Sequence, residues 1–178
     1  MTFSNLCNDI FWKSTTDYHV TDSVDAPMNN PYELKSIEYY LYLKNWIDAV
    51  QWHFEDIIRD PHIDPVAAVA LKRRIDKSNQ DRTDLVELID SYFLDRYKDV
   101  KPLADATINT ESPAWAVDRL SILALKILPH AARSGTYGYD GRTSCTMPGK
   151  LDILLDNRKT FLRLSISCWL TSKQGRSI

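Results

Sequence analysis

The sequence predicts an all-α protein, a bundle of about four main helices, and three observations lead to this prediction. Apolar residues recur at helical spacing over long segments. A capping residue directly precedes a proline at three places where such a segment begins. All five glycines of the 178-residue chain follow residue 134, so the preceding part lacks a residue that weakens helices. Nothing in that part has the alternating pattern of a sheet.

The first 30 residues are expected to form a short N-terminal segment and a flexible arm. An apolar stretch is followed by residues 13–30, which are polar and show no periodicity. A single helical domain is expected over residues 31–170, with a tail over 171–178, because domains typically hold about 150 residues.

Two long helices are expected over residues 31–59 and 65–98. Each begins with a capping side chain followed by proline at the first helical position, Asn30-Pro31 and Asp64-Pro65. Glu33 adds the second half of a capping box to the first of these starts. The intervening turn, RDPHIDP, is short enough to make the two helices antiparallel neighbours, which predicts a long helical hairpin.

A third helix is expected from Pro113, after Ser112, to about residue 128, and a fourth from about Lys150. The third is the most apolar, so we expect it at the centre of the bundle. The intervening segment, 131–149, holds four of the five glycines and predicts a loop.

Composition and charge exclude several classes of protein. With 44% hydrophobic residues and a net charge of −2, the chain does not belong to the disordered class. Basic side chains are scattered in the C-terminal part, which argues against a nucleic-acid partner. No secretory leader and no run of about 18 apolar residues is present, so we expect a cytoplasmic protein without a membrane span. The three cysteines are too dispersed for a disulfide framework or a zinc site.

Polar side chains lie where the helical pattern predicts core. Residues 76–84 include no apolar side chain, although the stripe from Ile75 to Leu85 passes through them. A buried Arg82 would need a charged partner. The run is open to three interpretations: a solvated segment beyond its neighbours, an interior network that fixes helix register, or a polar pocket that binds a ligand or metal. The candidate polar site comprises His53, Glu55, Asp56, Asn79, Arg82, Glu87, Asp90 and Asp118.

Two subsets of this candidate site suggest different chemistry. Carboxylates are the ligands that Mg²⁺ prefers, and the metal set would be Asp56, Glu87 and Asp90. A guanidinium can donate two parallel hydrogen bonds to a phosphate or carboxylate. The residues that would bind a small anionic ligand are His53, Asp56, Asn79 and Arg82.

Four blocks follow one another along the chain: WIDAVQWHFEDIIRDPHIDP, RRIDKSNQDRTDLVELID, DRLSILALKI and KLDILLDNRK. Together they resemble an uncharacterised bacterial family that is catalogued only as a domain of unknown function. The resemblance implies an all-helical cytoplasmic protein whose relatives are often encoded near sugar-transfer and surface-polysaccharide genes. No catalytic residue is established for that family, so the resemblance assigns none here.

No nucleophile elbow, P-loop, dinucleotide fingerprint or zinc spacing is found. We therefore expect a helical binding or scaffold protein, with the link to surface-polysaccharide synthesis that the resemblance implies. Its partner would be a second copy, another protein or a small anionic ligand. The alternative is a Mg²⁺-dependent phosphate-ester or nucleotide hydrolase, because Glu87-x-x-Asp90 is similar to half of the motif of all-α nucleotide pyrophosphohydrolases. The hydrolase alternative would require Mg²⁺ as its cofactor, and the sequence predicts no other cofactor.

Overall fold

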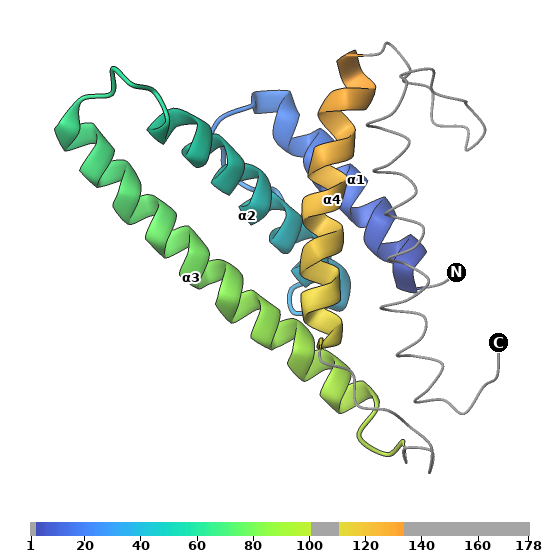
Figure 1. Ribbon diagram of the computed structural model, residues 1–178. Coiled ribbons are helices and arrows are strands. Elements are labelled where there is room, and N and C mark those ends of the chain that lie inside the picture. The colour runs from blue at the N-terminus through green and yellow to red at the C-terminus, as the bar shows by residue number, and fades with distance from the viewer. Residues whose placement is uncertain (1–2, 101–110, 134–178) are drawn as a thin grey trace.

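The computed structural model describes residues 3–100 and 111–133, which contain four helices (Figure 1). They are α1 (Phe3–Thr21), α2 (Ile37–Ile58), α3 (Pro65–Arg96) and α4 (Pro113–Arg133). No strand occurs within these two ranges, and the predicted all-α class is confirmed. The helix expected from Lys150 and the tail at 171–178 lie outside the described residues.

Two of the three predicted helix starts are confirmed. At α3, the Asp64 carboxylate accepts a hydrogen bond from the Ala67 N–H at 2.9 Å, and Pro65 occupies the first turn. At α4, the Ser112 hydroxyl accepts a bond from the Trp115 N–H at 3.3 Å. In both, a side-chain oxygen satisfies a backbone donor that has no partner within the helix. α4 continues to Arg133, so residues 131–133 of the expected loop are helical, and the rest of that loop lies outside the described residues.

The third predicted start is wrong: α2 is capped by Ser36, not by Asn30. The Ser36 hydroxyl accepts a hydrogen bond from the Tyr39 N–H at 3.0 Å. Asn30 instead accepts from the Tyr32 N–H at 3.1 Å and donates to the Tyr39 carbonyl at 3.0 Å. The Asn30 side chain therefore stabilises a local turn and connects the preceding loop to α2. An amide that makes these hydrogen bonds does not cap a helix.

The flexible arm expected over residues 13–30 is corrected for residues 13–21, which belong to α1. Polar side chains attach this half of α1 to α2. The Ser14 hydroxyl donates to the Tyr42 carbonyl at 3.0 Å, and the Thr15 hydroxyl donates to the Asn45 side chain at 2.7 Å. Both hydroxyls are buried, so within residues 13–21 the contact face is polar apart from Tyr18, and hydrophobic periodicity does not detect it.

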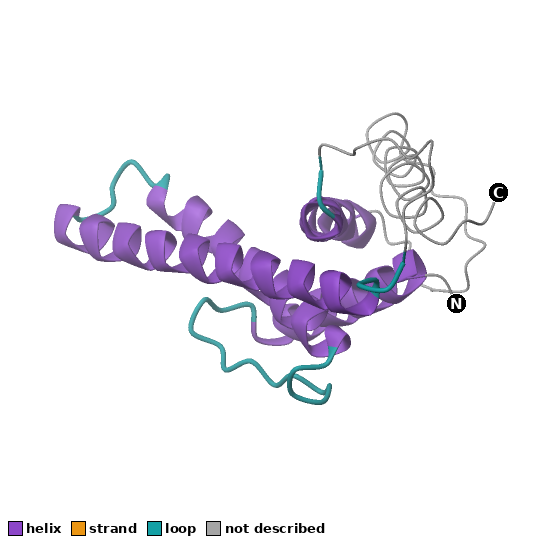
Figure 2. Ribbon diagram, turned by 90° about the horizontal axis from the view of Figure 1, so that it is seen from below, coloured by secondary structure: helices purple, strands orange, loops and turns teal. Residues whose placement is uncertain are grey.

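The predicted antiparallel hairpin is formed by α2 and α3, and α2 also contacts α1 and α4 (Figure 1). The turn after α2 is short, whereas residues 22–36 form a longer loop between α1 and α2 (Figure 2). The main core joins all four helices through residues that include Phe11, Leu41, Ile89 and Leu120. A smaller cluster of Phe54, Leu71 and Ile75 holds the hairpin near its turn. None of the helices in residues 3–100 and 111–133 combines the length and the apolar character that a membrane span requires.

Candidate functional site

Arg82 points inward from the polar run of α3 and meets Asp118 of α4. Its Nε donates to Asp118 Oδ1 at 2.8 Å, and its Nη2 donates to Asp118 Oδ2 at 2.6 Å. This two-pronged geometry is the strongest arrangement of an arginine and a carboxylate. Arg82 therefore has the charged partner that a buried position would require, supplied by another helix.

Two residues of α2 complete this group of charges. Lys44 and Asp48 are 0% and 1% exposed, and the Lys44 ammonium donates to the Asp48 carboxylate. The same ammonium lies 2.9 Å from Asp118 Oδ1, while Arg82 Nε lies 3.4 Å from Asp48 Oδ1. We call these four side chains the buried charge cluster. It holds two positive and two negative groups, so its charges balance when all are ionised.

Hydrogen bonds continue from this cluster to α1. The Ser121 hydroxyl donates to Asp48 Oδ2 at 2.5 Å and accepts from the Asn45 amide at 3.0 Å. Asn45 Oδ1 in turn accepts from the Thr15 hydroxyl at 2.7 Å. One chain of polar contacts thus joins all four helices, and a shift in register of any one would leave buried polar groups without partners.

The two carboxyl groups of the cluster have pKa values shifted in opposite directions. Complete burial raises the pKa of Asp48 above its ordinary 3.8, against the charges of Lys44 and Arg82. Burial acts in the same direction on Asp118, but hydrogen bonds from Arg82 and the charge of Lys44 outweigh it and lower the pKa. The hydrogen bonds to Asp118 also raise the pKa of Arg82. The ionised form of Asp118 is therefore the one that the fold favours.

This difference predicts a pH dependence of stability. Because the pKa of Asp118 is lower in the folded chain, its ionised form stabilises the fold above about pH 4. That stabilisation is lost as the pH falls through the folded-state pKa. Urea unfolding between pH 7 and pH 3 should therefore show that the difference in free energy of unfolding between wild type and Asp118→Asn becomes smaller as the pH falls.

Asp48→Asn is the matched comparison for this experiment. The pKa of Asp48 is raised, so its contribution to stability is fully present at low pH and declines as the pH rises through the folded-state pKa. The difference in free energy of unfolding between wild type and Asp48→Asn should therefore change with pH in the direction opposite to that of Asp118→Asn. Parallel pH profiles for the two variants would contradict the assignment of opposite shifts.

Most of the polar run from 76 to 84 is solvated. Asp76, Asn79 and Gln80 are exposed, and Lys77 pairs with Asp81 one turn along the helix at 3.0 Å. Arg82 is the member that joins the interior network, with 29% of its side chain exposed. The exposed residues of the run are solvated, but they lie beside α2 and not beyond the neighbouring helices as that interpretation had it. The network interpretation fits Arg82.

The remaining candidates on α2 lie away from the buried charge cluster. His53 contacts Tyr18 of α1 through a hydrogen bond between the tyrosine hydroxyl and Nδ1. Asp56 is exposed and pairs with Arg59 at 3.4 Å, while Glu55 accepts a hydrogen bond from Gln51 at 3.2 Å. The set proposed for an anionic ligand, from His53 to Arg82, does not converge.

The carboxylates proposed for Mg²⁺ are also separated. Asp90 accepts hydrogen bonds from the Ser112 hydroxyl at 2.7 Å and the Ala114 N–H at 3.1 Å, so it serves the start of α4. Asp56 lies near the end of α2, where Arg74 covers the neighbouring Phe54. Asp90 is roughly 24 Å further along α3 than Arg74, and Glu87 is exposed one turn before it. Asp56 and Asp90 therefore cannot bind one ion in this fold.

Lys44 and Asp48 were missed by the sequence reading, although the sequence holds a signal for them. From Ile37, steps of three and four residues lead through Leu41 and Lys44 to Asp48, the spacing of one helix face. A lysine and an aspartate one turn apart also match an ordinary exposed pair, so the pattern does not reveal their burial.

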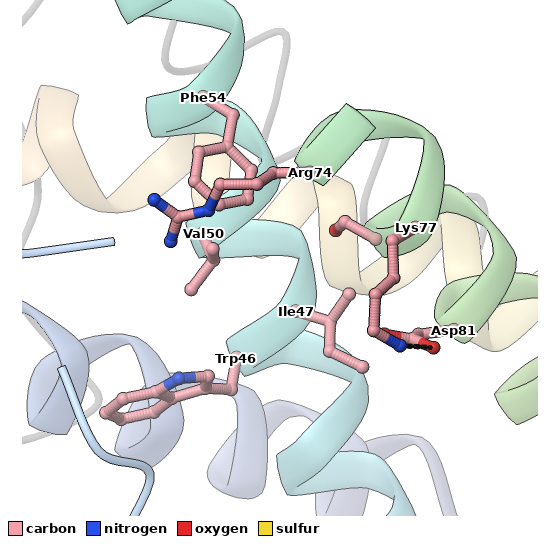
Figure 3. A pocket seen from close by; sticks show the side chains of 8 residues that line it. Trp46, Ile47, Val50, Phe54, Arg74, Lys77 and Asp81 are labelled. Atoms are coloured by element: carbon pink, nitrogen blue, oxygen red, sulfur yellow. Dashed lines mark hydrogen bonds and ion pairs between the residues drawn. The ribbon is translucent and has the colours of Figure 1, made fainter. Parts of the chain in front are cut away.

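A groove of about 230 Å³ lies between α2 and α3 (Figure 3). Its α2 side is apolar and consists of Trp46, Ile47, Val50 and Phe54. Its α3 side carries polar and charged groups, Arg74, Lys77, Ser78 and Asp81. The Arg74 guanidinium lies 4.6 Å from the centre of the Phe54 ring, a cation–π distance. Arg74 also bonds to Asp25 of the loop before α2, at 2.5 Å.

The fold and these two features define a helical-bundle protein with a charge-balanced polar centre and a surface groove along its long hairpin. The chain belongs to a family described as a protein of unknown function, DUF4254, whose family model matches residues 38–168. That match confirms the resemblance to a family of unknown function. Comparisons with curated proteins and with solved structures found no match.

Proposed function

We propose that this chain is a binding protein whose ligand occupies the groove between α2 and α3. The observation that carries the proposal is the composition of the groove, with an apolar, partly aromatic wall facing two cationic side chains. Such a site combines apolar contact area with a few polar groups that fix orientation. The ligand it suits has a flat or apolar face and an anionic group.

The cations of the groove can exchange partners at little cost. Arg74 is paired with Asp25 and Lys77 with Asp81, and all four side chains are substantially exposed. Exposed ion pairs of this kind contribute at most about 1 kcal/mol to stability. A phosphate or carboxylate on the ligand would therefore displace an aspartate without disturbing the core.

Binding is preferred over the Mg²⁺-dependent hydrolase because of how the carboxylates are used. Asp48 and Asp118 are already bound to Lys44 and Arg82, and Asp90 holds the start of α4. These three carboxylates therefore support structural roles better than a shared Mg²⁺ site. We also propose a cytoplasmic location, with which the buried free thiol of Cys7 is compatible.

The family resemblance suggests the first ligands to test. Sugar phosphates and nucleotide sugars combine a ring face with an anionic group, and a link to surface-polysaccharide synthesis would supply them. A panel containing glucose 1-phosphate, UMP, UDP-glucose and glucose should be screened by thermal shift and followed by calorimetry. We expect the anionic members to raise the melting temperature and uncharged glucose to leave it unchanged.

Arg74→Ala should weaken binding of the responding ligand about tenfold or more, because a charge-assisted hydrogen bond is lost. Arg73→Ala is the matched control: Arg73 is the adjacent, exposed residue and does not line the groove. Equal effects of the two substitutions would contradict placement of the ligand in this groove. A chain that responds to no panel member, stays monomeric and captures no protein partner would contradict a binding function altogether.

A further inference from the structure

Two histidines and an aspartate meet where the end of α1 passes the last two turns of α2. His19 and Asp22 come from the end of α1 and its following residue, and His53 comes from α2. His19 Nδ1 lies 2.7 Å from Asp22 Oδ1, and His53 Nε2 lies 3.6 Å from the same oxygen. One potential ligand atom of each residue lies within 4.8 Å of those of the other two. We propose that these three side chains bind a Zn²⁺ ion.

Tyr18 holds His53 in the orientation that a metal ligand requires. Its hydroxyl bonds to His53 Nδ1, and the two rings stack with centroids 5.2 Å apart. Tyr18 is itself completely buried, with its ring edge-on to Trp46. Nδ1 is thereby engaged and Nε2 faces Asp22. Histidine ligands of metals characteristically use one nitrogen for the ion and the other for such an orienting bond.

The backbone places Asp22 between the two imidazoles. Asp22 has a positive φ of 51°, and its N–H bonds to the Tyr18 carbonyl at 2.9 Å as α1 ends. A carboxylate at this position faces the negative end of the helix dipole, which disfavours it. A cation bound at the carboxylate would offset that repulsion, so the electrostatics of the helix end favour occupancy by a metal ion.

The donor set and its spacing suit Zn²⁺. Zinc binds nitrogen and carboxylate oxygen at about 2.0–2.2 Å, which separates the ligands of a tetrahedral site by roughly 3.4 Å. The separation of His53 from Asp22 is already close to this value, and the His19–Asp22 hydrogen bond has to open by less than about 1 Å. The side chains of His19, Asp22 and His53 are 41%, 59% and 30% exposed, so solvent reaches the fourth position.

This site differs from the carboxylate set considered for Mg²⁺. Hard cations such as Mg²⁺ prefer oxygen ligands, whereas two imidazoles favour Zn²⁺ and its neighbours among the transition metals. It also lies outside the groove between α2 and α3, whose lining includes none of the three residues. Metal binding here and ligand binding there can therefore succeed or fail independently.

Calorimetry with Zn²⁺ on the full chain, prepared without a histidine tag and freed of metal with chelator, tests the proposal. We expect one ion per chain, and Asp22→Asn, His19→Gln and His53→Gln should each weaken binding about tenfold or more. His62→Gln is the control, since His62 is an exposed histidine in the turn between α2 and α3. Zn²⁺ affinity that is unchanged in an Asp22→Asn/His53→Gln double variant would overturn the proposal, as would wild type that binds no Zn²⁺.

Tyr18 acts as a positioning residue, and Co²⁺ provides the readout for its role. Co²⁺ in place of Zn²⁺ should give visible absorption bands that respond to ligand geometry. Tyr18→Phe keeps the ring and removes only the hydroxyl, so we expect altered bands and an affinity lowered about tenfold. The same Co²⁺ spectrum in Tyr18→Phe and wild type would contradict the orienting role of the hydroxyl.

Discussion

Replacing Arg82 by methionine is expected to lower the free energy of unfolding by about 3 kcal/mol or more. The substitution keeps an apolar stem of similar length but leaves Asp118 and Asp48 facing a single cation, Lys44. The buried charge cluster then carries an uncompensated negative charge, and removal of one partner of a buried pair is far costlier than removal of both. Urea unfolding at pH 7 measures the loss.

Arg73→Met and the double variant Arg82→Met/Asp118→Leu are the two comparisons. Arg73 is exposed on the same helix, so its substitution should change stability by less than about 0.5 kcal/mol. The double variant removes one charge of each sign and leaves the Lys44–Asp48 pair balanced, so it should recover a large part of the loss. An Arg82→Met chain as stable as Arg73→Met would show that the network contributes nothing measurable.

Replacing Lys44 by methionine is expected to cost about 3–5 kcal/mol, because its ammonium is completely buried between two carboxylates. Lys72→Met offers an unusually close control. Lys72 also pairs with an aspartate one turn along a helix, Asp76, but both of these side chains are exposed. A surface pair of this spacing contributes about 0.3–0.5 kcal/mol, so the same chemical change should have a several-fold smaller effect there.

Melting curves and urea unfolding of the two lysine variants give this comparison directly. In Lys44→Met/Asp48→Leu, the Arg82–Asp118 pair remains balanced, and we expect part of the stability to return. Recovery should be incomplete, because the Ser121 hydroxyl loses its acceptor. Similar losses for Lys44→Met and Lys72→Met would contradict the burial of this lysine.

Local signals in the sequence predicted part of the fold well. Asp64 and Ser112 cap α3 and α4 as expected, since each precedes a proline and a long apolar periodicity. Asn30 precedes a proline too, but its side chain is used in a local turn, and Ser36 caps α2. The amide can satisfy the backbone in either way, and only the path of the chain decides between them.

The missed features share one cause, which is the burial of polar side chains. Ser14 and Thr15 of α1 face α2 through hydrogen bonds, so a segment that looked like a solvated arm is a packed helix. Lys44 and Asp48 look like a surface pair for the same reason. Hydrophobic periodicity detects apolar contact faces, whereas a face built on hydrogen bonds becomes visible only when its partner helix is in place.

The candidate site was predicted in part for similar reasons. Arg82 and Asp118 both belong to the predicted candidate site, and the fold brings them together. His53 was noticed too, but its neighbours Tyr18 and Asp22 lay in the segment expected to be a flexible arm. Without α1, the sequence could not place a second histidine and a carboxylate beside it.

Asp118 is the one member of the buried charge cluster that α4 contributes, and this has a consequence for the order of folding. The hairpin of α2 and α3 holds Lys44, Asp48 and Arg82, which together carry one excess positive charge. This hairpin leaves the ribosome before α4 does. The excess positive charge lies where α4 packs against the hairpin, and it attracts the carboxylate of Asp118, which neutralises it. We expect this attraction to favour the alignment of α4 in which Asp118 reaches both Lys44 and Arg82.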